Sequence, residues 1–306
     1  MIAWSRKRAY TANTWRSMRR LPKRTNHERC IMTGKDIRLS RLFSNNENAV
    51  VIAVDHGEFD GPLPGMIKLP SVVKRIYPGV SAVLLSPGML QHCGHIFSYK
   101  GSPMAIVRLN WSTVYAFHWG YNDADTVPAM SAEEAVASGA DVVLVSLTLK
   151  TGNEARDAHN VEVFCRQSSE ARRLGLPVVG EFFPARSGSL SEEEMQDQIY
   201  RGCRILAELG ADLIKTFYTY KFREVTAACP VPVLGLGAEK LPTQLQALQL
   251  AERIVQDGGR GVVFGRNAIQ VPDPTAFQQA LCDVVKKGIS ASQAARDYGL
   301  HEPNIC

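Results

Sequence analysis

Short apolar runs alternate with longer amphipathic stretches along the chain from residue 49 onward. Eight runs are rich in Val, Ile and Leu and are bounded by Gly, Pro or Asp: Ala49–Val54, Val80–Leu85, Met104–Leu109, Asp141–Leu147, Pro177–Phe182, Asp212–Phe217, Val231–Leu236 and Gly261–Phe264. Nearly continuous apolar strands fit a sheet that is covered on both faces, because neither face then meets water. The pattern therefore predicts eight buried parallel strands.

Helical patterns fill the intervals between these runs. Ser131 and Ser191 each precede a group of glutamates, which is typical of a helix start. Eight strand–helix units joined by right-handed crossovers, in about 250 residues, predict an α/β fold of the closed (β/α)8 TIM-barrel class. An open doubly wound sheet is the alternative, but the Gly-x-Gly-x-x-Gly turn that usually marks it does not follow the first run. We expect residues 36–306 to form this single barrel domain.

The first 35 residues differ from the rest in charge. Residues 1–29 hold nine Lys and Arg and one acid, Glu28; without this segment's +8, the net charge of +5 becomes −3. Three interpretations remain open: an organelle-targeting segment, a disordered basic arm, or an extension upstream of a true start at Met32. We predict that residues 1–35 are disordered or not native, and that the protein binds no nucleic acid.

Composition excludes several other classes of protein. No apolar stretch approaches the roughly 20 residues that a membrane span needs, so we expect a soluble, cytoplasmic protein without a membrane partner. The seven cysteines are scattered and include no Cys-x-x-Cys pair, which argues against disulfides and zinc. The segment Gln91-His92-Cys93-Gly94-His95 lacks a carboxylate partner and helical spacing, so we predict no metal site.

Polar residues at the ends of the strands are the candidates for chemistry, because a barrel places its active site there. Lys215 lies within the sixth run, on the same face as Leu213 and Phe217. Lysine is almost never buried unless it is paired, and burial favours the neutral amine that attacks a carbonyl. We predict that Lys215 forms a Schiff base, whose iminium makes a neighbouring carbon–carbon bond breakable.

Carboxylates end two other strands. Asp55 follows the first run and is expected to point into the barrel mouth as a catalytic group. Glu181 ends the fifth run and is a candidate either for general acid–base catalysis or for pairing with Lys215. Alternation directs His56 away from Asp55, towards packing or substrate binding. Arg108 and Asn110 at the third tip are weaker candidates for holding substrate hydroxyls.

The last two tips predict a phosphate site. Gly237 and Ala238 follow the seventh run, and Gly265 and Arg266 follow the eighth. Glycines at these two tips let backbone N–H groups approach an oxyanion, and an arginine adds positive charge.

These tips resemble the class I aldolases of the archaeal fructose-bisphosphate type, a family with deoxyribose-phosphate aldolase and quorum-signal thiolase relatives. The resemblance covers about Leu39 to Val285. It rests on Asp55-His56-Gly57 with Gly61-Pro62, on Gly210-Ala211-Asp212 with Ile214-Lys215-Thr216, on Cys229-Pro230-Val231-Pro232, and on Gly265-Arg266-Asn267 with Gln270. It implies a Schiff-base lysine at Lys215, a catalytic carboxylate at Asp55, no metal or cofactor, and a homo-oligomer, often a decamer. It also implies that Gly237, Ala238, Gly265 and Arg266 hold a phosphate.

One departure concerns the proton donor. The family carries Tyr-Pro-Arg after strand five, where this chain has Phe183-Pro184-Ala185-Arg186. The proton would then come from Glu181, Tyr218 or a water, and we count His56 and Tyr218 among the substrate-binding candidates. We predict a lyase that cleaves or forms a carbon–carbon bond in a phosphorylated keto-sugar. The alternatives are a thiolase-type acyl transfer from a phosphorylated diketone to coenzyme A, and a non-catalytic phosphosugar-binding barrel.

Overall fold

Eight parallel strands close into a barrel in the computed structural model, which describes residues 32–121 and 123–300. The strands are β1 (Ala49–Ala53), β2 (Ala82–Leu85), β3 (Met104–Arg108), β6 (Val142–Leu147), β7 (Val178–Phe182), β8 (Leu213–Phe217), β9 (Val233–Leu236) and β10 (Gly261–Phe264). Their order around the barrel is β1-β10-β9-β8-β7-β6-β3-β2. Each strand coincides with one of the predicted apolar runs, and the predicted TIM barrel is confirmed.

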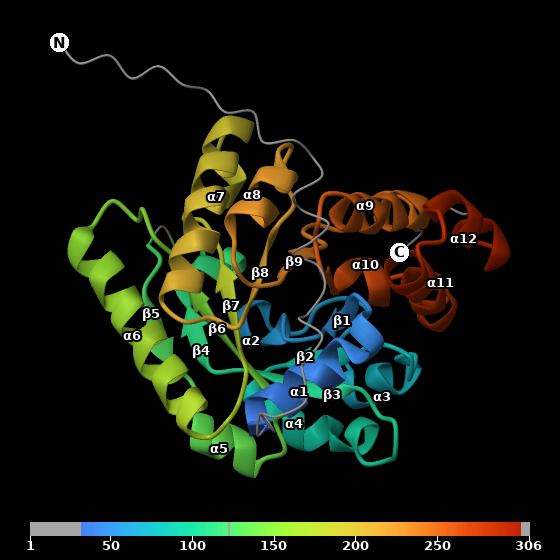
Figure 1. Ribbon diagram of the computed structural model, residues 1–306, viewed down its shortest axis with the longest axis horizontal. Helices are drawn as coiled ribbons and strands as arrows, with labels where there is room; N and C mark the ends of the chain where they lie inside the picture. The colour runs from blue at the N-terminus through green and yellow to red at the C-terminus, as the bar shows by residue number, and fades with distance from the viewer. Residues whose placement is uncertain (1–31, 122, 301–306) are drawn as a thin grey trace, which may run out of the picture. The chain divides into compact units, whose positions relative to one another are not determined.

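Helices surround the strands (Figure 1). They are α1 (Gly34–Leu42), α2 (Gly57–Asp60), α3 (Leu69–Val72), α4 (Pro87–Cys93), α5 (Ala132–Ala137), α6 (Glu154–Arg173), α7 (Glu192–Glu208), α8 (Phe222–Ala228), α9 (Gln244–Gln256), α10 (Arg266–Ile269), α11 (Pro274–Lys287) and α12 (Ala291–Asp297). Ser131 and Ser191 cap α5 and α7 as predicted, each in a capping box with a glutamate three residues later.

Alternate strand residues divide the core into two layers. On β8, Leu213 belongs to the cluster inside the barrel, whereas Ile214 packs in the layer between the sheet and the helices. Because side chains alternate along a strand, the residue two positions after Leu213 points inward again, nearer the carboxyl end. That residue is Lys215.

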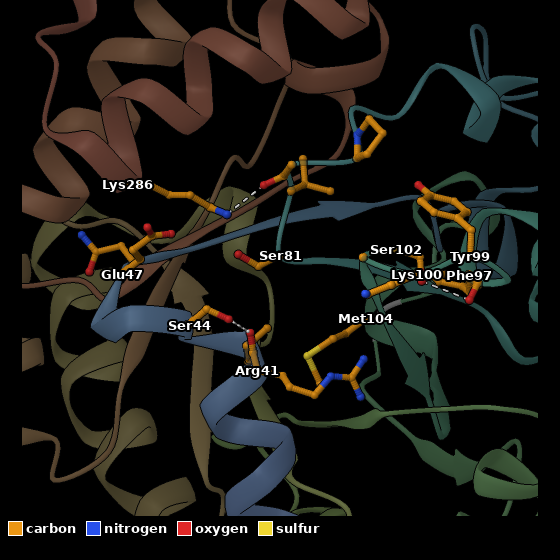
Figure 2. A pocket seen from close by; sticks show the side chains of 16 residues that line it. Arg41, Ser44, Glu47, Ser81, Phe97, Tyr99, Lys100, Ser102, Met104 and Lys286 are labelled. Atoms are coloured by element: carbon orange, nitrogen blue, oxygen red, sulfur yellow. Dashed lines mark hydrogen bonds between the residues drawn. The ribbon is translucent and has the colours of Figure 1, made fainter.

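The amino end of the barrel is closed by α1, whose Leu42 packs in the interior cluster. A cavity of about 620 Å³ lies beside it (Figure 2). Two of its cations are bonded within the fold: Arg41 pairs with Asp141 at 2.8 Å, and the Lys286 ammonium donates to the Gly79 carbonyl at 2.8 Å. These two contacts stabilise the fold at this end of the barrel.

An antiparallel hairpin lies between β3 and β6 and was not predicted. Its strands β4 (Asn110–Ser112) and β5 (Thr126–Pro128) pair directly after the end of β3. The 3-10 turn η4 (Thr113–Tyr115) follows β4 and carries Tyr115 into an aromatic cluster with Phe59 and Phe183. The hairpin thus adds side chains to the carboxyl end of the barrel.

The predicted extension over residues 1–35 falls mostly outside the described residues, and Gly34 and Lys35 form the start of α1. Its interpretation stays a prediction, as do the homo-oligomer and the cytoplasmic location. Within the described part of the chain, no helix is long and apolar enough to cross a bilayer.

Candidate active site

Lys215 and Glu181 form an ion pair inside the carboxyl end of the barrel. They are register partners on β8 and β7, so both side chains point into the interior. Lys215 Nζ lies 2.6 Å from Glu181 Oε1, and the two residues are 7% and 1% exposed. Of the two roles that the sequence left open for Glu181, pairing with Lys215 is observed in the free protein.

Arg108 extends this pair into a chain of four charges. It is the last residue of β3 and is 1% exposed. Its Nη2 lies 2.6 Å from Glu181 Oε2 and 2.8 Å from Asp55 Oδ2. Two carboxylates occupy Nε and Nη2 of Arg108, while its Nη1 has no partner among the described residues, so the expected role of Arg108 in holding substrate hydroxyls stays a prediction. Asn110, the neighbouring candidate, bonds Ser146 through its side-chain amide.

The buried cations keep both carboxylates ionised. Burial by itself raises the pKa of a carboxyl group, but the charges of Arg108 and Lys215 outweigh it and lower the pKa of Asp55 to about 2. The same two cations also lower the pKa of Glu181 against the effect of its burial. Glu181 is therefore a carboxylate at neutral pH and can accept a proton from a neighbouring group.

Glu58 and Tyr115 enter the site without having been predicted. Burial, with a small contribution from Asp55, raises the pKa of Glu58 to about 8 despite the nearby Arg108. Tyr115 lies with its ring 4.8 Å from the Arg108 guanidinium carbon and 4.5 Å from the Phe183 ring. Glu58 lies on the short helix after β1 and Tyr115 on the unpredicted hairpin. Both residues follow the end of a barrel strand closely in the sequence, and this nearness to a strand end is the signal that could have identified them.

The tips of β9 and β10, where the sequence predicts a phosphate cradle, follow two paired strands. Gly265 packs against His56, and a Cβ at this position would lie 2.2 Å from His56 Cε1, so only glycine fits. The Arg266 guanidinium donates to the Ala238 carbonyl at 3.0 Å, which joins the two tips. The first backbone N–H groups of α10 have no acceptor within their own helix, so they can donate hydrogen bonds to an oxyanion.

The position of His56 differs from the sequence prediction. Its Nδ1 lies 3.9 Å from Asp55 Oδ1 and not on the opposite face. Strand alternation does not apply here, because β1 ends at Ala53 and α2 begins at Gly57. Burial and the nearby cations lower the pKa of His56 despite Asp55, which favours the neutral imidazole.

Tyr218 is not brought into the site. Its hydroxyl donates to Asp257 at the end of α9 with a distance of 2.9 Å, and its ring packs on Phe222 of α8. The phenol therefore faces the outer helices and is already engaged. Lys215, Glu181 and Asp55 come together, and His56, Gly265 and Arg266 lie beside them.

Comparison with known proteins identifies the family of the chain. The model of the DeoC/LacD family aldolases matches residues 49–271, which include all eight strands. The chain belongs to this aldolase family.

Relatives of this DeoC/LacD aldolase include an uncharacterized aldolase of Saccharolobus solfataricus, 29% identical over 87% of this chain and 99% of that protein. The 3-hydroxy-5-phosphonooxypentane-2,4-dione thiolase of Yersinia pestis is 28% identical over 89% of this chain and 88% of its own. An archaeal fructose 1,6-bisphosphate aldolase structure superposes with a TM-score of 0.68 at 27% identity, covering 81% of this chain and 98% of that one. A related structure has its catalytic lysine bound to the carbinolamine intermediate of the substrate.

Among residues 32–121 and 123–300, no group of three or more His, Cys, Asp or Glu side chains is arranged to hold a metal ion.

Proposed function

We propose that the protein is a class I aldolase that cleaves or forms a carbon–carbon bond in a phosphorylated keto-sugar through an imine on Lys215. The observation that carries this proposal is the 2.6 Å pair between the buried Lys215 ammonium and the Glu181 carboxylate. A buried carboxylate in contact with the amine can take its proton and release the neutral nucleophile.

The proposed reaction uses Glu181 as an acceptor and donor in turn. Glu181 takes a proton from Lys215, and the amine adds to the substrate ketone to give a carbinolamine. The proton returns to the carbinolamine oxygen, which leaves as water, and an iminium remains. Glu181 then takes the proton of the β-hydroxyl group, the adjacent carbon–carbon bond breaks, and the electron pair moves into an enamine. Reprotonation of the enamine carbon and hydrolysis release the second product.

The other residues position the substrate in this proposal. Arg108 holds both carboxylates, and Asp55 compensates its charge, so that Glu181 keeps one oxygen directed at Lys215. Gly237, Ala238, Gly265 and Arg266 hold the substrate phosphate, with the neutral His56 beside them. Two observations support phosphate binding here. His56 leaves room only for glycine at position 265, and Arg266 joins the two tips through its bond to Ala238.

Borohydride trapping tests the imine. The protein is incubated with dihydroxyacetone phosphate or fructose 1,6-bisphosphate and reduced, and the adduct is located by peptide mass spectrometry. We expect a secondary amine on Lys215 in the native protein and none in Lys215→Arg. Lys35→Arg is the matched control, because Lys35 also pairs with a carboxylate, Asp212, at 2.8 Å but lies at the amino end. Absence of any adduct on Lys215 with both compounds, despite measurable binding, would rule out the proposal.

Acyl transfer is the second candidate function. Two observations favour it: Phe183 provides no hydroxyl at its position, and the Yersinia pestis relative is a thiolase for a phosphorylated diketone. In that case the same lysine would activate the diketone, and coenzyme A would accept the acyl group. Product analysis of the phosphorylated diketone with and without coenzyme A distinguishes the two functions, since an aldolase is indifferent to the thiol.

A further inference from the structure

The Tyr115 hydroxyl is a buried donor with no hydrogen-bond partner among the described residues. Tyr115 is 7% exposed and is held on three sides: the Phe59 ring at 4.7 Å, the Phe183 ring at 4.5 Å, and the Arg108 guanidinium. A buried hydroxyl without a partner costs free energy, so its retention calls for an explanation.

The surroundings of this hydroxyl point to Glu181. Burial and the Glu181 carboxylate raise the pKa of the Tyr115 phenol, and both Glu181 and Ser146 lie close enough to the hydroxyl to affect that pKa, although neither contact has the geometry of a full hydrogen bond in the free protein. The Ser146 hydroxyl already donates to Asn110 at 3.2 Å. The charged groups that face Glu181 are Arg108, Lys215 and Asp55, of which only Arg108 and Lys215 contact it. Tyr115 is thus a donor without a full hydrogen bond, beside a carboxylate whose two oxygens are already paired with Arg108 and Lys215 in the free protein.

The reaction at Lys215 removes one of these two contacts. Glu181 Oε1 is paired to Lys215 Nζ, and Oε2 to Arg108. When Nζ bonds the substrate carbonyl carbon, it leaves Oε1. Once Glu181 has returned its proton to the carbinolamine oxygen, Oε1 is a buried carboxylate oxygen without a donor, which is strongly unfavourable.

We propose that Tyr115 is a positioning residue of this reaction, whose hydroxyl donates to Glu181 Oε1 once Lys215 Nζ has left that oxygen for the substrate. The inference rests on the proposed imine chemistry and deepens it. The new hydrogen bond holds Glu181 as an oriented carboxylate at the stage where it takes a proton from the substrate. No atom is transferred to or from Tyr115.

Tyr115→Phe is the test, because it keeps the ring packing and removes only the hydroxyl. The assay is deuterium exchange of dihydroxyacetone phosphate in D2O, followed by NMR, in which Glu181 removes a proton next to the iminium. We expect kcat to fall roughly 10- to 100-fold, with KM near the native value. Loss of a donor to a carboxylate raises its pKa, so the acid limb of the kcat profile moves to higher pH. The acid limb of kcat/KM, which reports the free protein, stays in place.

Stability provides an independent readout. Because the hydroxyl has no partner in the free protein, Tyr115→Phe is expected to raise Tm by roughly 1 to 3 °C while kcat falls. The matched control is Tyr298→Phe, which removes a phenol that donates to Asp283 at 3.0 Å, far from the site. This control is expected to lower Tm slightly and to leave both pH profiles unchanged.

The outcomes separate this inference from the proposed function. If native protein forms the Lys215 adduct while Tyr115→Phe keeps the native kcat and acid limb, the role of Tyr115 is overturned and the aldolase remains. If the kcat and kcat/KM limbs shift together, Tyr115 bonds Glu181 already in the free protein, which also contradicts the inference. If native protein neither forms the adduct nor exchanges deuterium, the proposed function fails and the inference fails with it.

Discussion

The carboxyl and amino ends of the barrel share the same eight strands but differ in how their buried polar groups are satisfied. At the amino end, Arg41 and Lys286 line a cavity and are bonded within the fold. At the carboxyl end, buried atoms of His56, Tyr115 and Arg108 have no partner in the described chain. Buried polar groups that only stabilise a fold are paired within it, whereas buried groups that bind a substrate can lack a partner until the substrate is present. At the amino end a buried atom of Arg38 on α1 also has no partner among the described residues, so the contrast supports a site at the carboxyl end because three such groups lie there around the contacts of Lys215 with Glu181 and of Arg108 with Asp55.

The largest expected effect is that of Lys215→Ala on turnover. Removing the nucleophile eliminates the imine, so we expect the proposed aldol cleavage to fall by roughly 10⁴-fold or more. Steady-state kinetics with fructose 1,6-bisphosphate measure this, with circular dichroism to verify the fold. Turnover near the native rate would show that the two ends do not differ in the way we propose.

Next in size is Glu181→Gln. The amide keeps the shape of Glu181 but cannot accept a proton, so we expect kcat to fall by roughly 10²- to 10⁴-fold. In the native protein the Glu181 pKa is lowered, so activity is retained through neutral pH and is lost only as the pH falls through that depressed value. The kcat/KM profile of native protein from pH 8 to pH 4 measures this limb, because kcat/KM reports the free protein. A limb above pH 6 would contradict the assignment.

Glu58→Gln should change stability in a pH-dependent way. The folded-state pKa of Glu58, about 8, lies above its usual value of 4.5. Stability from this group is therefore present below pH 4.5 and is lost as the pH rises towards 8. We expect the variant to be more stable than native protein by roughly 2 to 4 kcal/mol at pH 8 and nearly equal to it at pH 5. Urea unfolding at both pH values checks this, and an equal gain at both would contradict it.

The smallest effect is expected at the amino end. Arg41→Ala removes an ion pair whose arginine side chain is 52% exposed. We expect a loss of roughly 0 to 1 kcal/mol in the free energy of unfolding and no change in turnover. Urea unfolding and the same kinetic assay measure both quantities. A tenfold fall in turnover would show that this end also takes part in function.

The direction of a side chain could be predicted from the sequence within the strands but not in the loops that follow them. The eight runs predict all eight barrel strands, and alternation along β7 and β8 predicts that Glu181 and Lys215 point inward. Alternation gives the wrong side for His56, because the chain has already left β1 and turned into α2. Tyr218 is a different case: alternation from Lys215 through Phe217 directs it outward, and its ring does pack against α8, so the error lay in counting it among the substrate-binding candidates. Local periodicity holds only while the strand lasts.

By itself, the sequence determined the barrel, the inward lysine with its carboxylates, and the glycines of the last two tips, because these depend on local periodicity and on residue type. Only the tertiary structure decided that Arg108 links Asp55 to Glu181 and that the hairpin carries Tyr115 beside Glu181. Asp55 and Glu181 are separated by 126 positions, and no local pattern records which strands close around one arginine. Closure of the barrel brings these charges together and thereby sets the protonation states on which the chemistry depends.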